Sequence, residues 1–124
     1  MKKRILVIDD DALVLKTLEN LLTRQGYEVE SAKDGPEAET KLKAKGANLI
    51  ICDIRMPGED GVHVIQSLKQ ICREEIKSEI PFMFITGYAS EEAPIDAIKL
   101  GAKDYLLKPF DLHELMTSVK RHIG

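Results

Sequence analysis

Residues 4–11 read Arg4-Ile5-Leu6-Val7-Ile8-Asp9-Asp10-Asp11, an apolar run that stops at three consecutive carboxylates. Short apolar runs of this kind recur along the chain, and most are rich in Ile, Val, Leu or Phe. Runs of four to six apolar residues are typical of strands that are buried on both faces. The run at residues 27–32 alternates between polar and apolar residues instead, which suits a strand at the edge of a sheet. We therefore predict strands at 4–8, 27–32, 48–52, 82–85 and 103–107.

Helical patterns fill the gaps between these runs. Apolar side chains in residues 11–25 share one arc of a 3.6-residue wheel, namely Val14, Leu15, Leu18, Leu21 and Leu22. Gly26 follows as a stop signal. Asp11 suits the N-cap position of this helix, as Asp111 does that of the last helix. We predict helices at 11–25, 34–45, 61–72, 90–100 and 111–123.

Strands that alternate with helices predict an α/β fold. The five units make a (βα)5 chain, in which a doubly wound five-stranded parallel sheet is covered by helices on both faces. A chain of 124 residues suits one domain, so residues 1–124 are expected to form a single unit. In such sheets the ligand site lies at the carboxyl ends of the strands, near the point where the strand order reverses.

Composition excludes several classes of protein. With 18 Lys and Arg against 21 Asp and Glu, the net charge of −3 leaves no basic stripe for nucleic acid. Hydrophobic residues make up 44% and charged residues 31%, so neither disorder nor membrane insertion is expected. Cys52 and Cys72 lie in apolar segments and are interpreted as buried, reduced thiols. We expect a cytoplasmic protein.

Polar residues stand where four of the predicted strands stop, namely Asp9-Asp10-Asp11, Asp53, Thr86 and Lys108. Helix capping explains Asp11 but not the other three carboxylates. Clustered carboxylates repel one another unless a cation lies between them. Because all-oxygen ligation selects Mg²⁺, Mn²⁺ or Ca²⁺, the pattern predicts a divalent-cation site.

This set of groups suits the handling of a phosphoryl group. The cation and Lys108 would neutralise charge on phosphoryl oxygens, while Thr86 and the backbone N–H of Gly87 would donate hydrogen bonds. Asp53 would be the nucleophile, since carboxylates can attack phosphorus and form an acyl phosphate. The scattered histidines are interpreted as structural or solvated, namely His63, His113 and His122.

At this point the sequence resembles the receiver domain of two-component response regulators. The residues that carry the resemblance are Ile8-Asp9-Asp10, Cys52-Asp53-Ile54-Arg55-Met56-Pro57-Gly58-Glu59-Asp60-Gly61, Thr86-Gly87 and Asp104-Tyr105-Leu106-Leu107-Lys108-Pro109-Phe110. Each motif alone is weak, but the ordered set is highly specific and covers essentially the whole chain. The resemblance implies a flavodoxin-like fold with the strand order 2-1-3-4-5.

The resemblance also implies a role for each site residue. Asp53 would be the phospho-acceptor, with Lys108 and Thr86 as the other catalytic groups. The donor would be a phosphohistidine on a sensor histidine kinase or a histidine phosphotransfer protein. Mg²⁺ would be held by Asp9, Asp10, Asp53 and the main-chain carbonyl of Arg55. The Lys108–Pro109 bond would be cis.

A conformational switch follows from the same resemblance. The hydroxyl of Thr86 would move toward the phosphoryl group, and Tyr105 would rotate inward behind it. The output face would be formed by the fourth helix, the fifth strand and the fifth helix. Separately, Ile95 lies outside the apolar arc of the fourth helix, so our hypothesis places it on this face, against a partner or a second copy. A phosphorylation-dependent homodimer through this face is expected. The chain would act as no enzyme on other molecules, but would catalyse its own phosphorylation and dephosphorylation.

Three further features bear on partners and packing. Leu13 and Thr17 lie outside the apolar arc of their helix and beside Asp10, so we interpret them as docking a histidine-containing helix. The fifth strand opens with Lys103-Asp104 rather than two acids, which weakens the case for a charge-paired dimer. Residues 71–80 form a long connection that we interpret as a solvated helical extension.

Other classes of protein fit less well. A Mg²⁺-dependent phosphohydrolase of the dehalogenase type would use a strand-one aspartate as nucleophile, and Asp9-Asp10-Asp11 keeps this alternative open. A flavodoxin-like cofactor carrier would need a phosphate loop after the first strand, where three aspartates would repel the phosphate. A scaffold that is never phosphorylated would not need the complete set of site residues.

Overall fold

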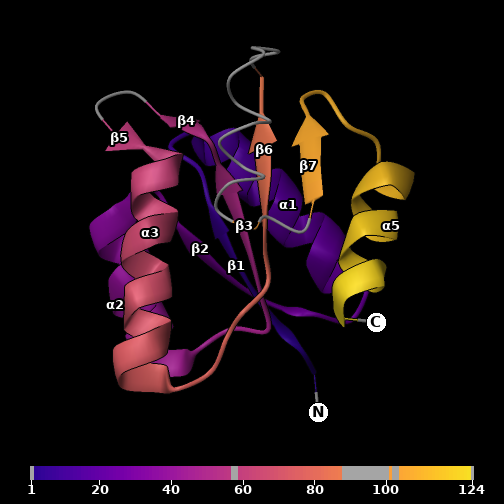
Figure 1. Ribbon diagram of the computed structural model, residues 1–124. Coiled ribbons are helices and arrows are strands. Elements are labelled where there is room, and N and C mark those ends of the chain that lie inside the picture. Colours follow the sequence, from indigo (N-terminus) through magenta and orange to yellow (C-terminus); the bar gives the residue numbers. More distant parts are fainter. Residues whose placement is uncertain (1, 57–58, 88–100, 102–103, 124) are drawn as a thin grey trace.

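The computed structural model describes residues 2–56, 59–87, 101 and 104–123. At its centre lies a sheet of five parallel strands in the order β2-β1-β3-β6-β7 (Figure 1). Their bounds are β1 (Arg4–Ile8), β2 (Glu28–Ala32), β3 (Leu49–Asp53), β6 (Phe82–Thr86) and β7 (Asp104–Leu107). Counted among the parallel strands alone, the order is 2-1-3-4-5. The predicted doubly wound, flavodoxin-like α/β fold is confirmed.

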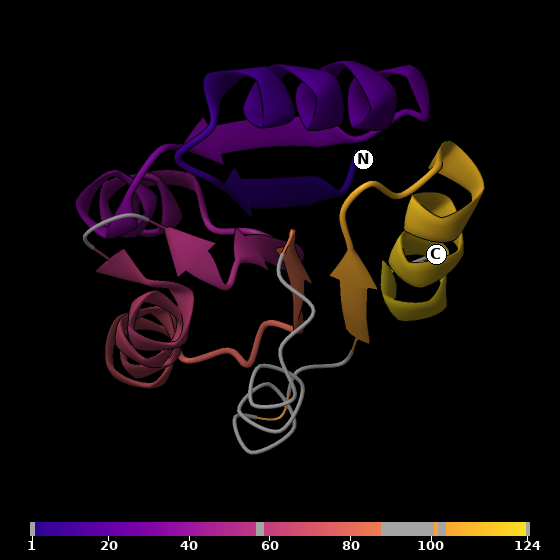
Figure 2. The same cartoon turned by 90° about the horizontal axis from the view of Figure 1, so that it is seen from above.

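Helices cover both faces of this sheet. Their bounds are α1 (Ala12–Arg24), α2 (Gly35–Lys45), α3 (Gly61–Ile71) and α5 (Leu112–Ile123). Helices α1 and α5 lie on one face, and α2 and α3 lie on the other (Figure 2). The helix predicted at 90–100, and Ile95 with it, falls outside the described residues. None of the helices within the described ranges is long and apolar enough to cross a bilayer.

Side chains of the central strands alternate between two apolar clusters. Ile5 and Val7 of β1 pack in a cluster with residues of α1 and α5, whereas Leu6 and Ile8 pack in one with residues of α2 and α3. Each fully buried Leu or Ile side chain contributes about 1.5–3 kcal/mol relative to its exposed state. Strand β2 is only partly buried, as its alternating sequence predicts for a sheet edge. The two clusters fix the helices on either face of the sheet, and because its strands are parallel their carboxyl ends lie along one edge.

Aspartate side chains start the helices. The carboxylate of Asp11 accepts a hydrogen bond from the Leu13 N–H at 2.9 Å, and that of Asp111 accepts from the Glu114 N–H at 2.7 Å. Both predicted N-caps are therefore confirmed, and such a cap is worth about 1 kcal/mol. At the other end of α1, Gly26 has φ +97°, a backbone conformation that glycine adopts without strain.

Two local features differ from the prediction. The helix predicted at 61–72 ends at Ile71, and the chain continues as a π-helical turn, η1 (Cys72–Ile76). The expected helical extension is thus present, but with π rather than α geometry over these residues. Two short antiparallel strands that the sequence did not predict, β4 (Arg55–Met56) and β5 (Glu59–Asp60), follow β3.

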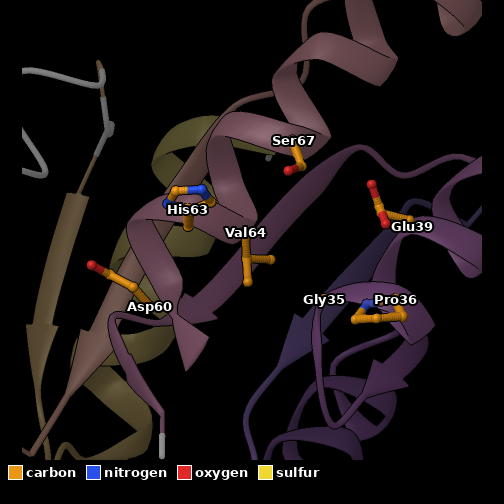
Figure 3. Close-up of a pocket in the computed structure, with 7 residues that line it drawn as sticks. All are labelled: Gly35, Pro36, Glu39, Asp60, His63, Val64 and Ser67. Carbon is orange, nitrogen blue, oxygen red and sulfur yellow. The ribbon is translucent and has the colours of Figure 1, made fainter. Parts of the chain in front are cut away.

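A hollow of about 350 Å³ lies between α2 and α3. Glu39 of α2 and His63 and Ser67 of α3 line it, together with Asp60, which precedes α3 (Figure 3). The carboxylate of Asp60 already accepts a hydrogen bond from the Val62 N–H at 2.9 Å and caps α3. The negative charge of Asp60 is therefore partly offset by the N-terminus of α3.

Candidate functional site

The carboxyl edge of the sheet gathers the residues that the sequence singled out. Asp9 follows β1, Asp53 ends β3, Thr86 ends β6 and Lys108 follows β7. Strands β1 and β3 are neighbours whose last pair in register is Ile8 and Cys52, so the two following aspartates lie side by side. We call Asp9, Asp10, Asp53, Thr86 and Lys108 the acidic edge.

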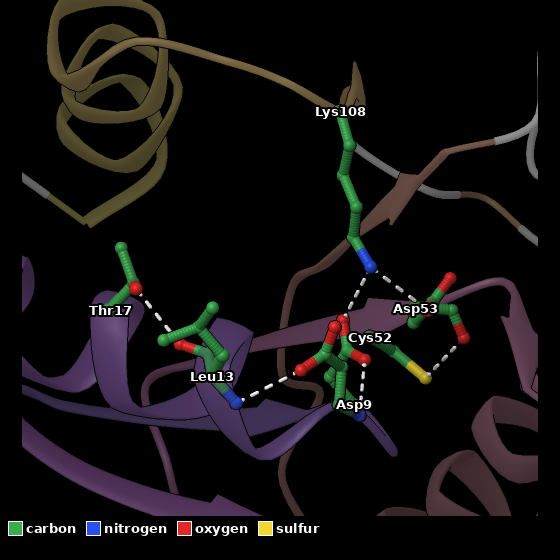
Figure 4. Close-up of polar contacts among 7 residues, drawn as sticks. Asp9, Leu13, Thr17, Cys52, Asp53 and Lys108 are labelled. Atoms are coloured by element: carbon green, nitrogen blue, oxygen red, sulfur yellow. Dashed lines mark hydrogen bonds and ion pairs between the residues drawn. The ribbon is translucent and has the colours of Figure 1, made fainter.

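The ammonium group of Lys108 joins the two buried carboxylates. Its Nζ lies 2.7 Å from Oδ2 of Asp9 and 3.1 Å from Oδ2 of Asp53 (Figure 4). The main-chain N–H of Lys108 donates to the carbonyl oxygen of Thr86 at 2.7 Å, which fixes the end of β7 against the end of β6. The Lys108–Pro109 bond is cis, as the resemblance implied.

Three carboxylates meet on the open side of this lysine. One oxygen from each of Asp9, Asp10 and Asp53 lies within 4.8 Å of the others. Asp9 is fully buried, Asp53 is 5% exposed and Asp10 is exposed, so the cluster can be approached from solvent on one side. Oxygen-only donors at this spacing fit a hard divalent cation such as Mg²⁺. Arg55, whose main-chain carbonyl was expected to be a Mg²⁺ ligand, begins β4 two residues beyond Asp53.

Burial and pairing shift the pKa values of this edge. Burial raises the pKa of Asp9 above its ordinary value, and the bonds from Lys108 and from the Asp11 N–H offset only part of this effect. Burial lowers the pKa of Lys108, but the hydrogen bonds and charges of Asp9 and Asp53 outweigh it, so the net pKa is raised. Lys108 is therefore positively charged at neutral pH and can offset negative charge beside Asp53.

The main chain around Asp53 is packed closely by Gly61, a contact that the sequence did not reveal. The Gly61 N–H donates to the carbonyl oxygen of Ile54 at 3.0 Å. A Cβ at Gly61 would lie 2.7 Å from the Cα of Ile54 and even closer to the carbonyl oxygen of Asp53. Because a side chain cannot fit there, only glycine lets α3 begin against the backbone at the end of β3. The one feature of the sequence that could have pointed to this contact is a glycine directly after Asp60, the residue that caps α3.

The proposed switch residues lie on neighbouring strands. Thr86 is fully buried, and the register pairs Asp53 with Ile85, so Thr86 lies one residue beyond Asp53 on the adjacent strand. Tyr105 pairs with Phe84 and is partly buried against the cluster that α2 and α3 share. These positions agree with the sequence-based roles, which remain predictions.

Comparisons with known proteins identify the class. The sequence profile of the response regulator receiver domain matches residues 5–120. The chain belongs to this family and is a receiver domain of the two-component response regulators. The dehalogenase-type alternative is not supported. Both oxygens of Asp9 accept hydrogen bonds, from the Asp11 N–H at 2.9 Å and from Lys108.

Individual relatives agree with this class. The chain is 38% identical over 119 residues to the probable transcriptional regulator ycf27 of Cyanophora paradoxa, covering 96% of this chain and 47% of that protein. It is 36% identical over 120 residues to the alkaline phosphatase synthesis transcriptional regulatory protein PhoP of Bacillus subtilis, covering 97% and 48%. The chain thus spans about half the length of these two relatives.

Solved structures show the same fold over the whole chain. The chemotaxis protein CheY4 of Vibrio cholerae superposes with a TM-score of 0.88 at 27% identity, covering 98% of this chain and 99% of that one. The non-phosphorylated receiver domain of HemR from Leptospira biflexa superposes with a TM-score of 0.84 at 32% identity, covering 99% and 95%.

Proposed function

We propose that Asp53 accepts a phosphoryl group from a phosphohistidine on a sensor histidine kinase or a histidine phosphotransfer protein. The observation that carries the proposal is the position of Asp53, 3.1 Å from the Lys108 ammonium and with a carboxylate oxygen within 4.8 Å of oxygens of Asp9 and Asp10. Asp53 combines a slight exposure with this charged surrounding, whereas Asp9 is fully buried. Residues 1–124 would form this one receiver domain.

The transfer step can be written from these groups. A carboxylate oxygen of Asp53 attacks the phosphorus, the P–N bond of the phosphohistidine breaks, and its electron pair leaves with the imidazole. Lys108, already charged, offsets the negative charge on the phosphoryl oxygens, while the Thr86 hydroxyl and the Gly87 N–H donate to them. Mg²⁺ held by Asp9, Asp10, Asp53 and the Arg55 carbonyl would supply further positive charge there.

The same site accounts for self-catalysed loss of the phosphoryl group. Water attack on the acyl phosphate restores the Asp53 carboxylate and releases inorganic phosphate, with the groups that assisted its formation still in place. The chain would therefore catalyse its own phosphorylation and dephosphorylation and act on no other substrate. Cys52 and Cys72 are buried and form no disulfide within the described residues, which supports the proposed cytoplasmic location.

Phosphorylation would be read out through Thr86 and Tyr105. A phosphoryl group on Asp53 adds charge and acceptor oxygens one residue from Thr86 on the neighbouring strand. Movement of Thr86 toward it would free space, and Tyr105 would turn inward to fill it. The hydrogen bond from the Lys108 N–H to the Thr86 carbonyl links this movement to β7.

Helix α1 offers a docking surface for the donor. Leu13 is 72% exposed in the first turn of α1, directly after the Asp11 cap and close to Asp10. The Thr17 hydroxyl donates to the Leu13 carbonyl at 2.8 Å, so Thr17 would contribute its methyl group rather than a hydrogen bond. We expect Leu13→Asp to slow transfer from the phosphohistidine protein while leaving phosphorylation by a small phosphate donor unchanged.

A phosphorylation-dependent homodimer would use the described part of the output face, β7 and α5. Leu107 at the end of β7 is 46% exposed and Leu112 at the start of α5 is 40% exposed. Asp104 is already paired with Arg121 at 3.0 Å within the same chain, so a dimer held together by this carboxylate is not favoured. Sedimentation of the phosphorylated and unphosphorylated protein tests the association, and Leu112→Asp should abolish it.

Intact-mass measurement tests the central proposal. We would mix the protein with Mg²⁺ and phosphoramidate and compare the wild type with Asp53→Ala and with Glu19→Ala, an exposed carboxylate of α1. One added phosphoryl group on the wild type and on Glu19→Ala, but none on Asp53→Ala, is expected. A label that survives in Asp53→Ala and is lost in Asp9→Ala would move the nucleophile to β1 and refute the proposal.

A further inference from the structure

The amino end of the sheet carries a second hollow, far along β6 from the acidic edge. It has a volume of about 550 Å³ and is lined on its buried side by Cys72, Ile80 and Phe82. Its cationic lining residues are Lys69, Arg73 and Lys77, and we call these six residues together the basic pocket. Phe82 begins β6 and Thr86 ends it, so the pocket is separate from the proposed phosphorylation site.

The chain follows an unusual path around this pocket. The π-helical turn η1 brings Arg73 to the lining. Lys77, the first residue after η1, has φ +61°. A left-handed conformation is uncommon for a residue other than glycine, and π turns occur frequently at functional sites. The main-chain N–H groups of Lys77 and Ser78 both donate to the carbonyl oxygen of Cys72, at 2.7 and 3.3 Å, which holds this path in place.

Two of the cations in the basic pocket, Arg73 and Lys77, form no ion pair with the described residues. Neither Arg73 nor Lys77 has a carboxylate within 4.0 Å in the part of the chain that the structure describes, and Glu79 is the one acid in the described lining. The neighbouring acids of η1 point to other partners: Glu74 accepts from the Gln70 amide at 3.1 Å, and Glu75 pairs with Lys43 at 3.5 Å.

An aromatic ring lies beneath one of the cations. The Lys69 ammonium is 5.5 Å from the centroid of the Phe82 ring, and Phe82 packs edge-to-face on Phe84 with centroids 5.7 Å apart. Phe82 is 4% exposed, so a flat apolar group in the hollow can contact the exposed part of this ring while an anionic group on it meets the cations. The hollow between α2 and α3 lacks this pairing, since its titratable lining residues are Glu39, Asp60 and His63 (Figure 3).

We propose that the basic pocket binds a small aromatic anion, that is, a flat ring system that carries one carboxylate, sulfonate or phosphate. Its volume lies within the range of about 300–1,000 Å³ that is usual for small-molecule sites. The ring would lie against Phe82 and Ile80, and the anionic group would lie between Arg73 and Lys77. This proposal does not depend on phosphorylation of Asp53.

A pair of fluorescent probes tests it. 8-Anilinonaphthalene-1-sulfonate carries the anion, and N-phenyl-1-naphthylamine has the same rings without it. We expect the sulfonate to bind the folded protein roughly tenfold more tightly, because two surface charge contacts contribute up to about threefold to fivefold each. Amide chemical-shift changes should be confined to residues around 69–82.

Charge variants locate the binding. Arg73→Gln and Lys77→Gly should each weaken sulfonate binding about threefold to fivefold and leave binding of the neutral probe unchanged. Glycine at position 77 keeps the left-handed backbone, so this variant is expected to fold at least as well as the wild type. Arg24→Gln, at an exposed arginine at the end of α1, is the matched control and should bind like the wild type.

Three outcomes would overturn the proposal. They are equal affinity for the two probes, an unchanged affinity of both pocket variants for the sulfonate, and shift changes centred on another surface. Phosphorylation of Arg73→Gln by phosphoramidate should equal that of the wild type. If Arg73→Gln were phosphorylated less than the wild type, the claim that the two sites are separate would be wrong. The proposal that Asp53 is the acceptor would not be affected.

Discussion

At the acidic edge the ammonium of Lys108 bridges two buried carboxylates, whereas at the amino end of the same sheet the cations Arg73 and Lys77 are exposed, with no carboxylate partner among the described residues. The difference follows from burial. Charges that folding removes from water must find partners within the chain, because an unpaired buried charge costs several kcal/mol. Charges that remain in water need no partner. Substitutions at the two ends should therefore have very different effects on stability.

The largest effect is expected at Gly61. Gly61→Ala places a Cβ against the carbonyl group of Asp53 and the Cα of Ile54, and neither backbone atom can move without disturbing β3. We expect a loss of about 3 kcal/mol in the free energy of unfolding, measured by urea denaturation. Gly87→Ala is the control, because a Cβ there meets no atom of the described residues within 4 Å. Equal stability of the two variants would show that the contact is not rigid.

Removal of Lys108 is the next largest expected change. Lys108→Ala leaves two buried carboxylates facing each other without a cation, so the metal-free protein should lose about 2–3 kcal/mol of unfolding free energy. Lys120→Ala, at an exposed residue of α5, should change stability by less than about 0.5 kcal/mol. The double variant Lys108→Ala with Asp9→Asn should recover part of the loss, since one of the two charges is gone. No recovery would contradict the electrostatic explanation.

A smaller and opposite effect is expected for Asp9 alone. Its pKa is raised, so its ionisation weakens the folded state as pH rises above the ordinary value of 3.8. Without Mg²⁺, Asp9→Asn should be more stable than the wild type at pH 7 by roughly 1 kcal/mol, and the difference should vanish in acid, below both pKa values. Mg²⁺ at ten times its dissociation constant should add about 1.4 kcal/mol to the wild type. A variant that is stabilised equally by Mg²⁺ would show that Asp9 is not a ligand.

The smallest effect belongs to Asp104, where a carboxylate is paired near the surface. Burial raises its pKa, but hydrogen bonds from Ser118 and the Tyr105 N–H, with the charge of Arg121, outweigh burial and leave the pKa below 3.8. The carboxylate therefore stabilises the fold at neutral pH, and this contribution disappears as pH falls through 3.8 and below. Asp104→Asn should cost about 0.5 kcal/mol at pH 7, given that Arg121 is largely exposed. A difference that persisted in acid, below both the folded-state and the unfolded-state pKa of Asp104, would refute the assignment.

The sequence predicted the fold and the membership of the acidic edge because both depend on patterns. Apolar runs that stop at polar residues place Asp9, Asp53, Thr86 and Lys108 at one edge, and parallel topology brings them together. The predicted strand 48–52 was displaced by one residue, since Asp53 continues the ladder to Ile85. Main-chain hydrogen bonds form regardless of the polarity of a side chain, so polarity is a poor guide to where a strand ends.

Other features could not be read from the sequence for physical reasons. Strands β4 and β5 have two residues each, too few to show a period. The π turn η1 and the left-handed Lys77 depend on how α3 is joined to β6, which local propensity does not specify. The role of Gly61 depends on its contact with the backbone of Asp53 and Ile54, which a one-dimensional pattern does not contain.

The thiol of Cys52 can report the local opening of β3, the strand that carries Asp53. It is fully buried in β3, and its Sγ lies 3.4 Å from the carbonyl oxygen of Asp53. An alkylating reagent can reach this sulfur only when the strand opens, so the alkylation rate measures how often the strand that carries Asp53 separates from its neighbours. The alkylation rate of this one cysteine therefore times the local opening of the strand that carries Asp53.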